Sequence, residues 1–294
     1  MTRRAWIAPA AAGLLGACSL APAHVRPALP VPASWPVGDS YLQRLDAPVP
    51  TLSSGEVFRD PRLQALIAQA LANNRDLRVA AANVAAARAR ARVARAQRLP
   101  EVVIGASGDV RRANGTTADS GGLDVGVSAF ELDLFGRLAN AAAAERERAL
   151  STEAAARTVR LAVVTDLADA WATYAADRVL LDIARDTAAS ARRSVALTRA
   201  RLEGGIAPRT DLRQAEQVLF TAEADIAQGT AALALDANLI QLLVGAPIDL
   251  ALLPRDLAEA DAAITPVAAG ASAETLLRRP EVIEAEYLLR AADA

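Results

Sequence analysis

The only cysteine in this 294-residue sequence is Cys18, which ends a short apolar run near the start of the chain. Without a second thiol it can form no internal disulfide. With His24 as the single histidine, a metal site built from histidine and cysteine is excluded as well. The residues around Cys18 must therefore explain why the thiol is there.

Those residues have the order of a secretory signal. Arg3 and Arg4 give a basic start, and Ala5 to Gly16 form an apolar stretch too short to span a bilayer as a helix. Two small residues then precede the cysteine, as in a bacterial lipobox. The alternative is an incidental or buried cysteine beside an ordinary signal peptide.

The resemblance to lipoprotein signal peptides implies cleavage before Cys18, diacylglycerol on its sulfur and acylation of the new amine. Residues 1–17 are then the signal peptide. Ser19 stands where an inner-membrane retention signal usually has aspartate, and by this analogy it favours the outer membrane.

Composition argues against several classes of function. The net charge is −2, so no overall basic charge favours nucleic acid. We find no GxSxG motif, no paired catalytic carboxylates and no GxxxxGK[ST] phosphate loop, and His24 lies in a proline-rich stretch. We therefore predict no enzyme activity, no catalytic residues and no cofactor or metal. The aromatic content of 3% suits long helices packed through small side chains.

Residues 18–55 are predicted to be an extended tether, because they hold seven of the fifteen prolines. A helix over residues 60–98 is predicted next, with Asp60 as its N-cap and Pro61 in its first turn. Apolar residues recur along it every seven positions, at Leu63, Ala70, Leu77, Val84 and Ala91.

The second half of this helix carries five arginines, at positions 88, 90, 92, 95 and 98. No aromatic residues are interleaved with them, so nucleic-acid binding is disfavoured. We interpret the run as a charged helix face that is either solvated or set between protomers.

The period then changes from helical to alternating. Two strands are predicted at 101–111 and 122–132, each with apolar residues on one face and small or polar residues on the other, joined by a polar, glycine-rich loop. Strands of this kind match transmembrane β-barrel strands. On the strands alone a soluble hairpin with one buried face is favoured. The flanking helices reverse that preference, because such an isolated hairpin needs a partner surface.

Two long helices follow. Residues 137–203 contain neither proline nor glycine and correspond to a helix of about 100 Å at ~1.5 Å per residue. Gly204, Gly205 and Pro208 end it, and a returning helix is predicted over 209–244. Its apolar residues recur every seven positions, at Leu212, Leu219, Ile226, Leu233 and Ile240, and small residues fill a companion seam at Ala215, Ala222 and Gly229. The pattern predicts helices wrapped side by side.

An internal repeat appears at the end of the chain. Residues 71–89 resemble residues 276–294, so a second unit of the same kind begins there. Residues 56–272 are thus the first repeat, and residues 273–294 are the truncated start of a second.

Four stretches, FRDPRLQALIAQALANNRDLRVA, FELDLFGRL, RLEGGIAPRTDLRQAE and LLRRPEVIEAEYLLRAADA, together resemble successive signatures of the outer-membrane efflux factors. They are most similar to the lipoprotein branch typified by OprM and NodT, relatives of TolC. The resemblance implies a mainly α fold, in which a long helical hairpin forms part of a periplasmic α-barrel and two strands contribute to a transmembrane β-barrel. It further implies a homotrimer that docks to a periplasmic adaptor (membrane fusion protein), itself bound to an inner-membrane pump.

The same resemblance suggests which residues carry function. Arg201, Gly204, Gly205, Thr210 and Asp211 match the adaptor-facing hairpin tip. Asp133 and Gly136 would lie at the junction of strand and helix, with Asp133 either capping the next helix or simply exposed and Gly136 easing the turn.

The implied function is an outer-membrane exit duct of a tripartite efflux pump that passes small molecules passively. The alternatives are a type I protein-secretion duct, or a degenerate copy that acts only as a lipid-anchored coiled-coil protein. The chain is expected to be either a fragment of a longer gene product or such a copy, and the aperture residues would lie in the missing second repeat. Because a duct need not recognise its cargo, the sequence does not identify the exported compound. It does not identify the adaptor or the pump either.

Overall fold

The computed structural model describes residues 25–26, 53–266 and 273–294. The predicted signal peptide, Cys18 and most of the tether lie outside them. The described residues form two units. We call residues 53–79 and 158–266 the core unit, and residues 80–157 and 274–294, with 25–26, the hairpin unit; the division falls within two helices, α4 and α5.

The core unit is held together by apolar side chains from helices that are distant in sequence. Helix α3 (Pro61–Asn73) contributes Leu63 and Leu66, both fully buried. They pack in one cluster with Leu167 and Trp171 of α5 and with residues near the end of α6, including Ile240 and Val244. Short segments, α2 (Ser54–Val57), η1 (Leu250–Leu252) and α7 (Leu257–Ala262), complete this unit.

The predicted single helix over 60–98 is wrong: it is two helices, α3 and α4 (Arg75–Ala96), separated at Asn74. Asn74 leaves the helical conformation with φ −55° and ψ 137°. Its buried side chain donates from Nδ2 to the carbonyl of Leu243 at 2.7 Å and accepts the Leu77 N–H at 3.0 Å. Because the break turns the helix, the buried residues of α4 are Ala80 and Ala87 instead of members of the predicted seam.

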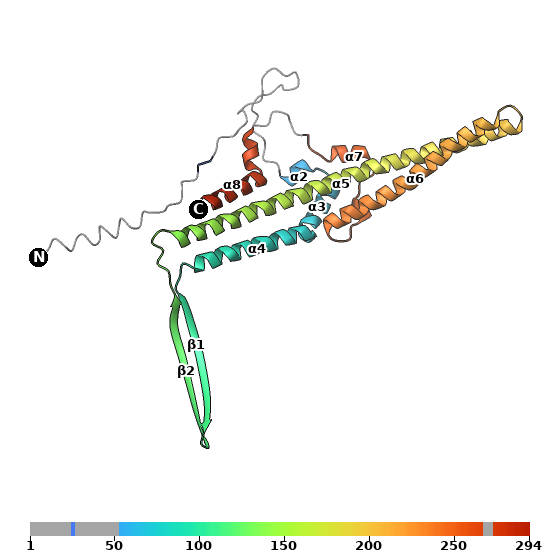
Figure 1. Cartoon of the computed structure of the whole chain (residues 1–294). Helices are drawn as coiled ribbons and strands as arrows, with labels where there is room; N and C mark the ends of the chain where they lie inside the picture. The colour runs from blue at the N-terminus through green and yellow to red at the C-terminus, as the bar shows by residue number, and fades with distance from the viewer. Residues whose placement is uncertain (1–24, 27–52, 267–272) are drawn as a thin grey trace. The chain divides into compact units, whose positions relative to one another are not determined.

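The two long helices have the predicted bounds. Helix α5 runs over Arg137–Glu203 and α6 over Arg209–Val244 (Figure 1). Within the core unit they lie side by side: a Cβ added at Gly229 of α6 would lie 3.4 Å from Leu181 of α5, which is ordinary contact. Among the described helices, α6 alone is long and apolar enough by composition to cross a membrane. Ion pairs also join it to α5, between Glu223 and Arg192 and between Glu216 and Arg199.

In the hairpin unit, β1 (Glu101–Ala113) and β2 (Thr116–Ala129) form an antiparallel pair. The strands are longer than predicted at the loop, because Asn114 and Gly115 make a two-residue turn with φ of 50° and 85°. At the other end β2 stops at Ala129, not 132, because its pairing with β1 ends at Glu101. Pro100, just before Glu101, has no N–H to continue the ladder. Segments η2 (Ala273–Arg278) and α8 (Pro280–Asp293) end the chain.

Candidate functional site

The β1–β2 hairpin has two chemically different faces. Val102 pairs with Val127 and Ile104 with Val125, so one face is apolar. Its large residues are about two-thirds exposed, with relative exposures of 61–73%: Val102, Ile104, Val110, Leu123, Val125 and Val127. Apart from Val103, the opposite face carries small or charged residues, among them Gly105, Ser107, Asp109, Asp124 and Gly126. Of the described strands, the two pair only with each other (Figure 1).

The apolar face is long enough for a transmembrane strand. Val102 to Val110 is nine residues, and a tilted transmembrane strand needs about 9–11. At the loop end Val110 stands opposite Asp119, so the apolar pairs run from Val102–Val127 to Ala106–Leu123. A transmembrane barrel presents an apolar band of about 25 Å to lipid. The soluble-hairpin alternative requires a covering surface, and in the described residues no element buries these side chains.

The junction between β2 and α5 is set by Asp133 and Gly136. Asp133 Oδ2 accepts the N–H of Ala139 at 2.8 Å, which is a capping contact in the first turn of α5. Partial burial raises the pKa of this carboxyl, but hydrogen bonds from backbone N–H groups and the charge of Arg98 outweigh it, so the pKa of Asp133 is lowered overall. Gly136 has φ of 76°, a conformation that glycine adopts without strain.

At the far end of α5, the five residues predicted for the hairpin tip are all exposed and lie together between α5 and α6: Arg201, Gly204, Gly205, Thr210 and Asp211. The Ile206 N–H donates to the Arg201 carbonyl at 2.8 Å and the Gly205 N–H to the Leu202 carbonyl at 3.0 Å. This pair of bonds, with Gly205 at φ 73°, is a Schellman motif. Ile206, which the sequence analysis did not single out, projects from the turn at 72% exposure.

Ion pairs that sequence reasoning missed join the two helices behind the tip. Glu216 of α6 binds Arg199 of α5 at 3.1 Å and Arg213 of its own helix at 2.7 Å. Arg213, and then Arg199, lower the pKa of the Glu216 carboxyl although burial opposes them. Two turns further along α6, Glu223 binds Arg192 at 2.9 Å. Ion pairs between α5 and α6 therefore hold the two helices together behind the tip. In the sequence, only the seven-residue spacing indicated which residues would face each other.

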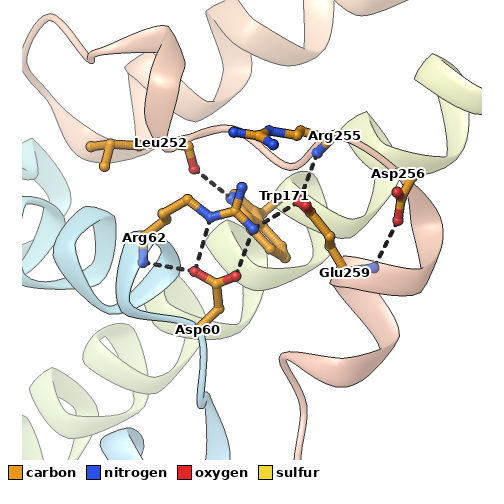
Figure 2. Close-up of polar contacts among 7 residues, drawn as sticks. All are labelled: Asp60, Arg62, Trp171, Leu252, Arg255, Asp256 and Glu259. Atoms are coloured by element: carbon orange, nitrogen blue, oxygen red, sulfur yellow. Dashed lines mark hydrogen bonds and ion pairs between the residues drawn. The ribbon is translucent and has the colours of Figure 1, made fainter.

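A polar cluster at the surface of the core unit was also missed (Figure 2). Asp60 caps α3 as predicted, accepting the Arg62 N–H at 2.7 Å. The Arg62 guanidinium also binds Glu259 of α7 at 2.8 Å and lies over the Trp171 ring, 5.7 Å from its centroid. Trp171 in turn donates from Nε1 to the Leu252 carbonyl at 3.0 Å. Arg62 thus links α3, α5 and α7.

Ion pairing shifts the pKa values of the charged groups in this cluster. The hydrogen bond from Arg62 lowers the pKa of Asp60, against the effect of burial. Arg62, with the N–H of Arg255, likewise lowers the pKa of Glu259. The carboxyls raise the pKa of Arg62. These shifts mark a structural clamp, since the groups are all paired and, in the described part of the chain, no metal-binding group of three or more His, Cys, Asp or Glu exists.

The model of the family named "Outer membrane efflux protein" matches residues 66–246. This chain belongs to that family. The probable efflux pump outer membrane protein TtgC of Pseudomonas putida is 38% identical over 96% of the chain, and the cation efflux system protein CusC of Escherichia coli is 35% identical over 95%. The chain spans 60% of the first relative's length and 62% of the second's.

Solved structures agree with this family assignment. A membrane protein from Pseudomonas aeruginosa superimposes with a TM-score of 0.77 at 30% identity, covering 94% of this chain and 63% of that one. CusC superimposes with a TM-score of 0.72 at 34% identity, covering 94% and 62%. The mainly α fold with a small two-stranded sheet is thus that of the TolC-like outer-membrane channels, as predicted.

Proposed function

We propose that this chain contributes strands and long helices to an outer-membrane exit duct of a tripartite efflux pump, through which small molecules leave passively. The observation that carries the proposal is the β1–β2 hairpin, which has one exposed apolar face and strands long enough to cross a bilayer when tilted. In water, such a face would be an aggregation hazard. In lipid it is satisfied, provided that further strands close the sheet into a barrel.

Closure of that barrel requires other strands. Two strands leave two open edges, and membrane barrels have eight strands or more. We infer that three copies, each with a second repeat, supply them. The acylated Cys18, which lies outside the described residues, would hold each copy on the periplasmic leaflet of the outer membrane.

The α5–α6 tip is the proposed contact with the periplasmic adaptor. It is exposed and held rigid by the Schellman turn and by the Glu216 ion pairs. Because no phosphate-binding loop occurs in the sequence, energy must come from the inner-membrane partner.

The names of the relatives support small molecules as the cargo. They include a toluene efflux pump outer membrane protein, an antibiotic efflux pump outer membrane protein and a cation efflux system protein. Since these cargoes differ in charge and polarity, we infer that substrate choice resides in the inner-membrane pump.

Deletion of the gene tests this proposal against a purely structural role. Loss of an exit duct lowers tolerance to pump substrates, and the intact gene product restores it. Unchanged tolerance would favour the lipid-anchored scaffold. In the same strain, a cross-linker attached through Asp211→Cys should capture the adaptor, whereas Asp225→Cys, an exposed position further along α6, should not.

A further inference from the structure

The carboxyl end of α4 presents cations that the proposed duct does not explain. Arg92, Arg95 and Arg98 are exposed and form no ion pair with any described residue. Arg88, earlier in the same run, differs: it binds Glu153 of α5 at 2.7 Å. Arg92 and Arg95 are therefore free to meet an external anion, whereas Arg98 also interacts with the charge of Asp133.

Large apolar side chains are exposed at the base of the hairpin. Leu99 follows Arg98 and lines one hollow with Phe130, and the carboxyls of Glu101 and Glu131 lie at the same hollow. Leu99 is 66% exposed, Phe130 54% and Phe135 68%. We call Arg92, Arg95, Arg98, Leu99, Phe130 and Phe135 the hairpin-base patch.

The helix dipole explains only part of this patch. Cations in the last turn of a helix interact favourably with its carbonyl end, and Arg95 stands there. That interaction does not account for exposed phenylalanines in the same place. Cations and aromatic rings together are typical of the interface between a bilayer and water.

The height of the patch fits the head-group layer. The apolar face of the hairpin ends at the Val102–Val127 pair, so the hairpin base begins where the hydrocarbon core ends. The head-group layer is about 7 Å deep on each side of the bilayer. Arg98 precedes the first residue of β1 by three positions, and Arg95 stands in the last turn of α4.

We propose that the hairpin-base patch binds the phosphate groups of anionic phospholipids in the periplasmic leaflet. This rests on the proposed membrane insertion of β1 and β2. The planar guanidinium of arginine pairs with phosphate through two parallel hydrogen bonds, and Phe130 and Phe135 contact the adjoining acyl chains. The patch fixes how deep the hairpin sits.

The test uses the complete gene product in vesicles of equal parts phosphatidylglycerol and phosphatidylcholine. The protein is extracted with detergent, and the two lipids that remain bound are measured by mass spectrometry. We expect Arg95→Gln with Arg98→Gln to lower the preference for phosphatidylglycerol about 25-fold, at about fivefold per arginine. Arg95→Lys with Arg98→Lys should keep much of it.

The matched control is Arg75→Gln with Arg78→Gln, two exposed arginines at the other end of α4, which should leave the preference unchanged. An equal preference in the Arg95/Arg98 glutamine variant and the wild type would overturn the proposal. Displacement of phosphatidylglycerol by inorganic phosphate would also overturn the proposal, because the patch would then bind any anion without recognising a lipid.

Protease protection of the strands, measured in the same vesicles, separates this inference from the proposed function. If the wild type inserts but shows no preference for phosphatidylglycerol, only the lipid-binding inference fails. If the wild type does not insert, the duct itself is contradicted.

Discussion

The core unit and the β1–β2 hairpin use the same kinds of apolar side chain in opposite ways. Leu66 and Trp171 of the core unit are 0% and 1% exposed, whereas Leu123 and Val125 of the hairpin are 73% and 66% exposed. Burial of such a side chain contributes roughly 1.5–3 kcal/mol. The core unit obtains this stabilisation from its own helices. Under the proposed membrane insertion, the hairpin obtains it from lipid.

The largest expected effect is the loss of stability when a large apolar side chain is shortened to alanine in the core unit, compared with the same change in the hairpin. Leu66→Ala should destabilise the protein by about 2–5 kcal/mol, because it leaves a cavity among fully buried neighbours. Val125→Ala should change the melting temperature in detergent little, since its side chain touches no core. Thermal unfolding followed by circular dichroism measures both. Equal losses would mean that the hairpin is packed against protein.

The second prediction places a charge on either face of the hairpin. Val125→Arg puts a guanidinium on the apolar face and should cost about 2–4 kcal/mol near the bilayer midplane, so that outer-membrane insertion falls sharply. Asp124→Arg, one residue earlier on the polar face, should insert normally. Insertion is measured as the amount of each variant in the outer-membrane fraction and by its heat-modifiability on gels. If neither variant inserts, the two faces of the hairpin do not differ as proposed.

The third prediction compares two glycines with positive φ: Gly245, which lies against the end of α3, and Gly205, which lies in the exposed turn between α5 and α6. At Gly245 (φ 75°) a Cβ would lie 2.7 Å from the Asn73 carbonyl oxygen, whereas at Gly205 (φ 73°) nothing lies within 4 Å. Gly205→Ala should therefore cost only the conformational strain, about 1–2 kcal/mol. Gly245→Ala should cost clearly more, because α3 and α6 must also move apart. Melting temperatures of the two variants would contradict this if Gly205→Ala were the less stable.

The smallest expected effect concerns pH. The pKa of Asp60 is lowered by Arg62, so its ionised form stabilises the folded state above the unfolded value of 3.8, and this contribution is lost as the pH falls through the folded pKa. Asp60→Asn should lower stability at pH 7 by about 1 kcal/mol through the weakened cap and ion pair, and should reduce the loss below pH ~4. Melting curves across pH measure the slope.

Asp236 of α6 provides the contrast to Asp60, because its pKa is raised whereas that of Asp60 is lowered. Burial and the neighbouring Asp177 raise the pKa of Asp236, and its Oδ2 has no hydrogen-bond partner. The folded state therefore binds a proton more tightly, and stability from this site increases as the pH falls through the raised pKa. Asp236→Asn should be neutral or slightly stabilising at pH 7, by no more than about 0.5 kcal/mol. A destabilised variant would contradict the assignment.

Local signals made much of this fold predictable. The end of α5 and the start of α6 follow from Gly204, Gly205 and Pro208, which together interrupt the helical pattern. The alternation in 101–111 likewise predicted a strand. The seven-residue pattern continues across Asn74 and so concealed the break there, although Asn74 is a near-neighbour cap that accepts the Leu77 N–H. The bond from Asn74 to the Leu243 carbonyl, 169 residues away, left no signal in the local sequence.

The candidate sites divide in the same way. Asp60 and Asp133 are near-neighbour caps that short-range sequence reveals. Arg62 stacking on Trp171 and bonding Glu259 depends on the packing of three helices and left no sequence signal. Strand ends were misjudged because they depend on register, and a register is a property of two segments together.

The claim that the apolar face of β1–β2 lies in lipid can be tested with one pair of spin labels. Cys18 is the only natural cysteine, so Val125→Cys and Asp124→Cys introduce adjacent labels on opposite faces. In native membranes, the label at position 125 should collide with oxygen, which concentrates in lipid, and the label at 124 with a water-soluble nickel complex. If the nickel complex reaches both positions equally, the hairpin is not in the membrane and the account fails.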